Sequence, residues 1–136
     1  MNITIFTQAE VPMTSILVVD DENDNVEVLC EYLELLGLDV IGRAHNGREA
    51  RELYEEIRPD VVLSDVLMPD FDGHYGLEKI LEFDPHANVI ILTASAVTPT
   101  ERNRLKDMGA LAVIQKPYEM NDVLKVIENI GNNIIS

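Results

Sequence analysis

Five polar residues stand at equivalent places in this 136-residue chain, each within two positions of the end of a short, continuously apolar block. They comprise three carboxylic acids, one hydroxyl and one amine: Asp20, Asp21, Asp65, Thr93 and Lys116. Polar residues often follow strands because loops begin there, but that explanation predicts no particular set of residue types. If the blocks are parallel strands, their carboxyl ends meet at one edge, where open α/β sheets bind ligands. The pattern therefore predicts that these five side chains converge in space.

Three carboxylates gathered at one edge repel one another, and at an effective dielectric of about 20 two unit charges 4 Å apart cost on the order of 4 kcal/mol. Such a site must take up protons, stay open or bind a cation. Hard carboxylate oxygens without His or Cys nearby favour Mg²⁺. Lys116 adds a mobile positive charge and Thr93 adds a hydroxyl donor. The combination predicts a pocket that stabilises an anion, such as a phosphoryl group on an aspartate.

The elements that would position these residues follow from the apolar pattern. Continuous apolar runs without alternation are typical of strands buried on both faces. The runs occupy residues 16–19, 61–63, 89–92 and 111–114, with a weaker candidate at 39–41. Because strand and helix alternate five times with short loops, the chain is predicted to be an α/β protein, a doubly wound parallel sheet with helices on both faces.

Apolar residues at helical spacing lie between the blocks. The first such stripe includes Val26, Leu33 and Leu36, and Asp24 with Glu27 three residues later suggests a capping arrangement at its start. A second stripe covers residues 50–57 and ends before Pro59, and three more cover residues 76–83, about 100–108, and 120–130.

Composition excludes several classes of protein. The formal charge of −15 argues against direct binding to nucleic acid or to an anionic membrane, because both reward clustered cations. No apolar run approaches the roughly 20 residues that a spanning helix needs. The lone Cys30 excludes an internal disulfide and fits a reducing, cytoplasmic location, and its place on the first helical stripe predicts a core residue. His45, His74 and His86 share no spacing that would indicate metal ligation.

Four segments together resemble the receiver domain of two-component response regulators, in the family's order and spacing. They are residues 18–22 (VVDDE), 65–73 (DVLMPDFDG), 93–94 (TA) and 116–118 (KPY). The similarity extends from about residue 15 to residue 130. The resemblance implies a flavodoxin-like sandwich with five helices and a five-stranded parallel sheet of order 2-1-3-4-5. This strand order is already known for a chemotaxis member of the family and is taken from it.

The resemblance also implies roles for individual residues. Asp65 would be the phosphoacceptor, with Mg²⁺ held by Asp21 and Asp65 directly, by Asp20 partly through water, and by the backbone carbonyl of Leu67. Lys116 and Thr93 would contact the phosphoryl group. The small Ala94 would leave room for that group, and the bond before Pro117 is a candidate cis peptide.

One position departs from the family pattern. Many receivers carry an aromatic residue three places before the lysine, and here that place is Val113. A β-branched side chain with one preferred rotamer cannot make the same large swing. Phosphorylation of Asp65 is still expected, but the aromatic side-chain rotation that usually follows it in the family is not expected here. Tyr118 is interpreted as a packing residue, and Asp70 and Asp72 as turn formers.

Residues 1–12 are expected to be a poorly ordered N-terminal extension, the alternative being an extra strand. Residues 13–131 would form the receiver domain, and residues 132–136 a C-terminal tail. The leading hypothesis is a stand-alone receiver that takes a phosphoryl group from a sensor histidine kinase or a histidine phosphotransfer protein and then binds a downstream protein target, as a monomer or weak homodimer. It would turn over no external substrate.

Three other hypotheses are weaker. A Mg²⁺-dependent phosphohydrolase with an aspartyl-phosphate intermediate needs an acid two residues after the nucleophile, where this chain has Leu67. A flavin- or nucleotide-binding carrier needs a glycine-rich loop after the first strand, which is absent from the sequence. A degenerate scaffold would not need all five polar residues.

Overall fold

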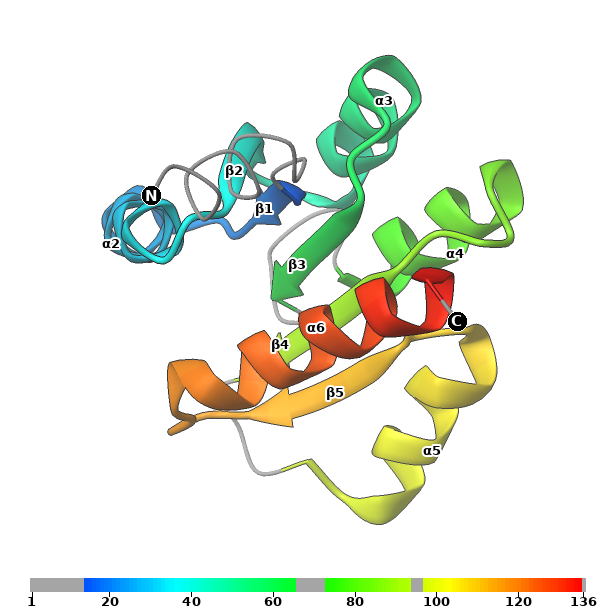
Figure 1. The fold of residues 1–136 in the computed structure, drawn as a ribbon. Helices are drawn as coiled ribbons and strands as arrows, with labels where there is room; N and C mark the ends of the chain where they lie inside the picture. The colour runs from blue at the N-terminus through cyan, green and yellow to red at the C-terminus, as the bar shows by residue number, and fades with distance from the viewer. Residues whose placement is uncertain (1–13, 66–72, 94–96, 136) are drawn as a thin grey trace, which may run out of the picture.

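A single parallel sheet organises the protein, in a computed structural model that describes residues 14–65, 73–93 and 97–135. The sheet has five strands in the order β2-β1-β3-β4-β5 (Figure 1). The strands are β1 (Ser15–Val19), β2 (Asp39–Ala44), β3 (Val61–Asp65), β4 (Val89–Thr93) and β5 (Ala112–Gln115). The predicted α/β class, strand number and strand order are confirmed. Residues 1–12, the expected extension, lie outside the described residues.

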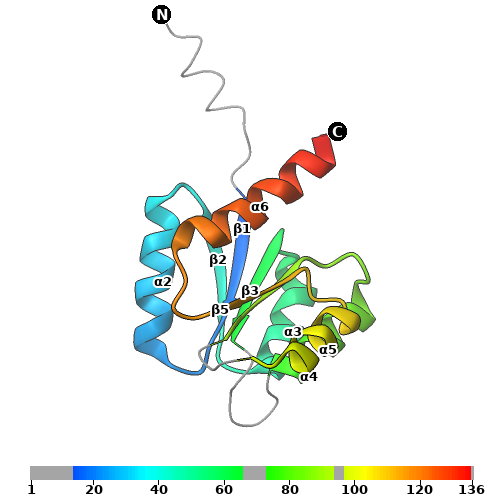
Figure 2. The ribbon, with the colours of Figure 1, turned by 90° about the horizontal axis from the view of Figure 1, so that it is seen from below.

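Five helices cover the two faces of the sheet, as predicted. They are α2 (Asn23–Leu35), α3 (Gly47–Ile57), α4 (Gly73–Phe83), α5 (Pro99–Met108) and α6 (Met120–Ile135). Helices α2 and α6 pack on one face, and α3, α4 and α5 on the other (Figure 2). None of the helices in the described part of the chain is both long and apolar enough to cross a bilayer.

The central strands are buried on both faces, which explains why their sequences show no alternation. In β1, Leu17 packs in the core beneath α3, α4 and α5, while Ile16 and Val18 pack beneath α2 and α6. All three are at most 1% exposed. The edge strand β2 is only partly buried, and it extends three residues beyond the predicted end at Ile41. Its weak apolar pattern reflects this position at the edge.

Two helix boundaries differ from the prediction. Helix α2 begins at Asn23 with Glu22 at its N-cap, and no side chain caps it, so the expected capping role of Asp24 is wrong. Asp24 lies instead in the first turn, where a negative charge interacts favourably with the helix dipole. Helix α6 continues to Ile135 because apolar residues recur at helical spacing beyond Ile130, up to Ile134.

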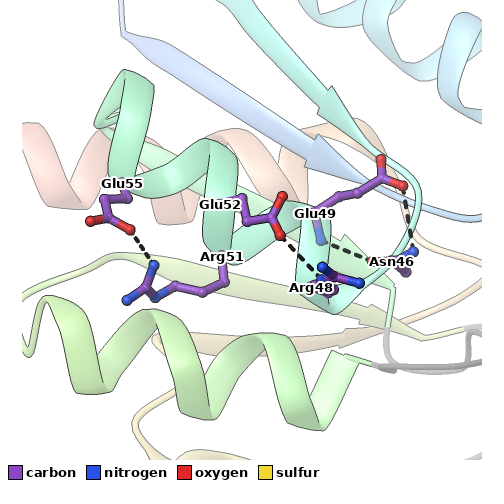
Figure 3. Close-up of polar contacts among 6 residues, drawn as sticks. All are labelled: Asn46, Arg48, Glu49, Arg51, Glu52 and Glu55. Carbon is purple, nitrogen blue, oxygen red and sulfur yellow. Dashed lines mark hydrogen bonds and ion pairs between the residues drawn. The ribbon is translucent and has the colours of Figure 1, made fainter.

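Helix α3 shows how local sequence fixes a start that the apolar stripe did not reveal. The Asn46 side chain accepts a hydrogen bond from the Glu49 backbone N–H at 2.9 Å (Figure 3). This N-cap starts the helix at Gly47, three residues before Ala50. On its exposed side, Arg48 and Arg51 pair with glutamates one turn later. The helix ends at Ile57, and its C-cap Arg58 has a left-handed backbone with a φ of 47°.

Candidate functional site

The carboxyl ends of β1 and β3 bring three aspartates together. In the register of the two strands, Val19 lies opposite Ser64, so Asp20 and Asp21 follow β1 beside Asp65 at the end of β3. Carboxylate oxygens from the three aspartates all lie within 4.8 Å of one another. The convergence predicted from the sequence is therefore present in the structure, and the three oxygens form a group of the kind that holds a metal ion.

Asp20 is the most buried of the three acids, at 8% exposed. Its Oδ1 accepts a hydrogen bond from the Glu22 backbone N–H at 3.0 Å, and its own N–H donates to the Ala44 carbonyl at 3.0 Å. Burial raises the pKa of Asp20, and the charge of Asp65 raises it further, while the Glu22 amide and Lys116 act in the opposite direction. Three carboxylates this close repel one another, and a bound cation would relieve that repulsion.

Thr93 and Lys116 complete the same edge of the sheet. Asp65 lies opposite Leu92 in the register of β3 and β4, so Thr93 ends the neighbouring strand. The Lys116 backbone N–H donates to the Thr93 carbonyl at 2.6 Å. Thr93 is 1% exposed, and the peptide bond between Lys116 and Pro117 is cis. A hydroxyl and an amine are therefore carried by adjacent strands next to the acids.

A pocket of about 340 Å³ opens at this edge and extends beneath α2. Asp20, Asp65 and Lys116 line it, and its other lining residues come from β1, β3 and β4, from α2, and from the segment after β5 up to the start of α6. The lining residues of α2 and of the segment after β5 are Asn25, Val28, Leu29, Tyr32, Tyr118 and Met120. A ligand bound beside the acids would therefore lie against a largely apolar wall.

Sequence reasoning missed this wall. The interpretation of Tyr118 as a packing residue is confirmed, because it packs against the core beneath α2 and α6, but it also lines the pocket. Burial raises the pKa of the Tyr118 hydroxyl there, and the charge of Asp20 raises it further. The available signal was the position of Tyr118, two residues after Lys116. Val28 and Tyr32 carried no signal, because they lie off the buried stripe of α2.

Several residues singled out from the sequence lie away from this edge of the sheet or outside the described residues. Leu67 and Ala94 lie outside the described residues, as do Asp70 and Asp72. Val113 is buried at 5% exposure in the core beneath α3, α4 and α5.

The Val113 backbone connects the strand to helix α5. The Val113 carbonyl oxygen accepts a hydrogen bond from Arg102 Nη1 at 2.6 Å. The next residue before Arg102 is Glu101, which contacts His74 of α4. The first turn of α5 is thus held to β5 on one side and to α4 on the other.

Cys30 takes the core place expected of it, and the histidines contact neighbouring acidic residues. His45 pairs with Glu49, and the backbone of His86 donates to Asp84. Cys30 is fully buried among the residues beneath α2 and α6. Within the described ranges, the candidate metal group consists of aspartates alone.

Comparisons with known proteins agree with this geometry. The profile of the response regulator receiver domain matches residues 16–128. The chain is 32% identical to the chemotaxis protein CheY of Thermotoga maritima over 116 residues, which are 85% of this chain and 96% of that protein. It is 34% identical to CheY of Halobacterium salinarum over 115 residues, 85% of this chain and 94% of the relative.

Solved structures show the same fold. CheY in the CheX-CheY-BeF3-Mg²⁺ complex from Borrelia burgdorferi superposes with a TM-score of 0.82 at 29% identity, covering 91% of this chain and 92% of that one. A response regulator receiver domain protein from Clostridium thermocellum superposes with a TM-score of 0.81 at 30% identity, covering 89% of this chain and 96% of the other.

Proposed function

Because this chain belongs to the response regulator receiver domain family of two-component signalling, we propose that it is a stand-alone switch that accepts a phosphoryl group on Asp65. The observation that carries the proposal is the grouping of Asp20, Asp21 and Asp65 within 4.8 Å, in a pocket that Lys116 also lines.

The donor set fits Mg²⁺. Carboxylate oxygens are the ligands that this ion prefers, and three of them lie within 4.8 Å of one another. Asp21 and Asp65 would hold the ion directly, Asp20 partly through water, and the Leu67 carbonyl would add a ligand. Magnesium bound there would supply positive charge to the phosphoryl oxygens.

The proposed transfer step uses the roles that the family resemblance implies. An oxygen of the Asp65 carboxylate would attack the phosphorus of a phosphohistidine. The P–N bond would break, with its electron pair leaving on the imidazole, which then takes a proton from solvent. Lys116 and Thr93 would bind the phosphoryl oxygens, and the small Ala94 would leave space for them. The product is an acyl phosphate on the protein itself, so no external substrate is turned over.

The phosphoryl group would then shift the protein between two conformers, favouring the one in which Thr93 and Lys116 close over it. The donor would be a sensor histidine kinase or a histidine phosphotransfer protein, and the readout a downstream protein target. A cytoplasmic monomer or weak homodimer is consistent with this role.

The decisive experiment is intact-mass analysis after incubation with phosphoramidate, with and without Mg²⁺. We expect a base-labile phosphoryl adduct that requires Mg²⁺ and disappears in Asp65→Asn. The matched control is Asp107→Asn, an exposed aspartate on α5, which should keep the adduct. An adduct that survives Asp65→Asn would contradict the proposal, and steady phosphate release from an unrelated monoester would favour a hydrolase.

A further inference from the structure

The exposed apolar side chains of this protein are concentrated on one helix. Of the six large apolar residues that are exposed among the described ones, four belong to α2 or its C-cap. They are Val28, Tyr32, Leu35 and Leu36, called here the α2 patch. Val28 is 67% exposed and Leu35 is 87% exposed. A contiguous exposed apolar row on a protein surface is typical of an interaction site.

The patch is a continuous face rather than a scatter. Its residues stand at positions i, i+4, i+7 and i+8 of the helix, a spacing that places side chains on one side. The inner end of the patch, Val28 and Tyr32, also lines the pocket that reaches Asp65. No strand or helix of the described protein lies on the outer side of α2, which forms one flank of the molecule (Figure 2).

The N-terminal segment, residues 1–13, joins the fold beside this patch. The Asp39 backbone N–H donates to the Thr14 carbonyl at 2.9 Å, so Thr14, the first described residue, lies next to Asp39. Asp39 is only three residues after Leu36 in the chain. Covering the patch from Leu36 to Val28 requires about 12 Å along the helix axis, at roughly 1.5 Å per residue. Eight extended residues span about 26 Å, so residues 3–6 can reach the far end.

The composition of the segment suits the patch. It carries Ile3, Ile5 and Phe6 close together, and in an extended chain the first two point to the same side. Its single charged side chain is Glu10, in a protein with 25 acidic residues. The adjacent exposed positions of α2 are acidic, at Asp24, Glu27, Glu31 and Glu34, and would repel a more acidic partner.

We propose that the N-terminal segment docks on the α2 patch of its own chain, with Ile3, Ile5 and Phe6 packed over Val28, Tyr32, Leu35 and Leu36. The docking needs no phosphorylation, so its test is independent of the function proposed above. Since Val28 and Tyr32 border the pocket, the docked segment would lie beside the entrance to the phosphoryl site.

The test is methyl NMR spectroscopy of the full-length, unphosphorylated protein. In a variant combining Ile3→Ser, Ile5→Ser and Phe6→Ser, we expect the methyl signals of Val28, Leu35 and Leu36 to shift. The matched control combines Thr4→Ser and Thr7→Ser, which leave the apolar residues in place and should leave these signals unchanged. Signals that stay fixed in the triple variant, or that shift equally at the exposed Leu111 of the β5 side, would overturn the proposal.

A second measurement does not depend on the triple variant. A nitroxide attached to Thr4→Cys should broaden the methyl signals of Leu35 and Leu36 much more than those of Leu111. The native Cys30 is fully buried and is not expected to take the label. Uniform broadening would overturn the proposal, as would broadening that fades on dilution, because the latter would assign the patch to a second copy.

Discussion

The Lys116 backbone N–H donates a 2.6 Å hydrogen bond to the Thr93 carbonyl, so the amine and the hydroxyl of the candidate site are mounted on one rigid connection between β4 and β5. The hydrogen bond places both residues at the same edge of the sheet as Asp65. The first prediction concerns the charge that Lys116 brings to this edge.

Replacing Lys116 with alanine should slow formation of the Asp65 adduct by about 10- to 100-fold, because one positive charge facing the phosphoryl oxygens is lost. The rate is measured by intact mass with phosphoramidate at saturating Mg²⁺. Lys125→Ala, an exposed lysine on α6, is the control and should be unchanged. Equal rates in both variants would remove Lys116 from the site.

Magnesium should stabilise the native protein and should lose most of this effect in Asp20→Asn. Without Mg²⁺, the variant should be more stable than the native protein by on the order of 1 kcal/mol, because one of three mutually repelling carboxylates is neutral while the acceptor for the Glu22 amide remains. Urea unfolding with and without Mg²⁺ measures both the stabilisation by the ion and the higher stability of the variant in its absence. A variant that is less stable without the ion would contradict the electrostatic account.

Val113 should not act as the moving part of the switch. It is buried and β-branched, and its carbonyl holds Arg102 of α5. On addition of beryllofluoride and Mg²⁺, we expect the Val113 methyls to keep their rotamer while the amides of Glu101 and Arg102 shift. Side-chain coupling constants and amide spectra measure this. A rotamer change at Val113 would contradict the prediction, because this side chain would then move as the aromatic residue of many receivers does.

Tyr54→Phe should destabilise the protein by about 1 kcal/mol, because the buried hydroxyl donates a 2.6 Å hydrogen bond to Asp84 Oδ2. This hydrogen bond lowers the pKa of Asp84 below its ordinary value of 3.8. A lowered folded-state pKa contributes stability above the unfolded value, and this contribution is lost as the pH falls. The difference between the two proteins should therefore shrink below about pH 4.

Urea unfolding over that pH range tests the Tyr54 prediction, with Tyr32→Phe as a control because Tyr32 is half exposed. A difference that grows in acid would contradict the assigned direction. At high pH, burial and Asp84 raise the pKa of Tyr54, so the native protein should lose stability as the pH rises above about 10, the ordinary pKa of the group.

Gly76→Ala should destabilise the protein by about 1–3 kcal/mol, although alanine normally favours a helix. A Cβ at this position would meet the Gly47 Cα at 3.0 Å, so α3 and α4 would have to separate. Thermal unfolding checks the sign, and Glu78→Ala on the exposed side of α4 is the control. A stabilised Gly76→Ala protein would show that the two helices yield easily.

The sequence alone determined the class of fold and the membership of the site. Strands buried on both faces must be apolar throughout, and parallel strands must share one carboxyl edge, so the grouping of Asp20, Asp65 and Lys116 followed from chain order alone. The four motifs also occur in the order and spacing of the receiver family, which predicts the same grouping. These properties are local or topological, and they do not depend on how individual side chains pack.

The tertiary structure decided what depends on neighbours distant in the chain. The requirement for glycine at position 76 depends on its close approach to Gly47 of α3, and the role of Tyr54 depends on Asp84 thirty residues away. The pocket wall of Val28 and Tyr118 arises only where α2 meets the segment after β5. Burial and pair distances are properties of the packed chain, so no periodicity in the sequence encodes them.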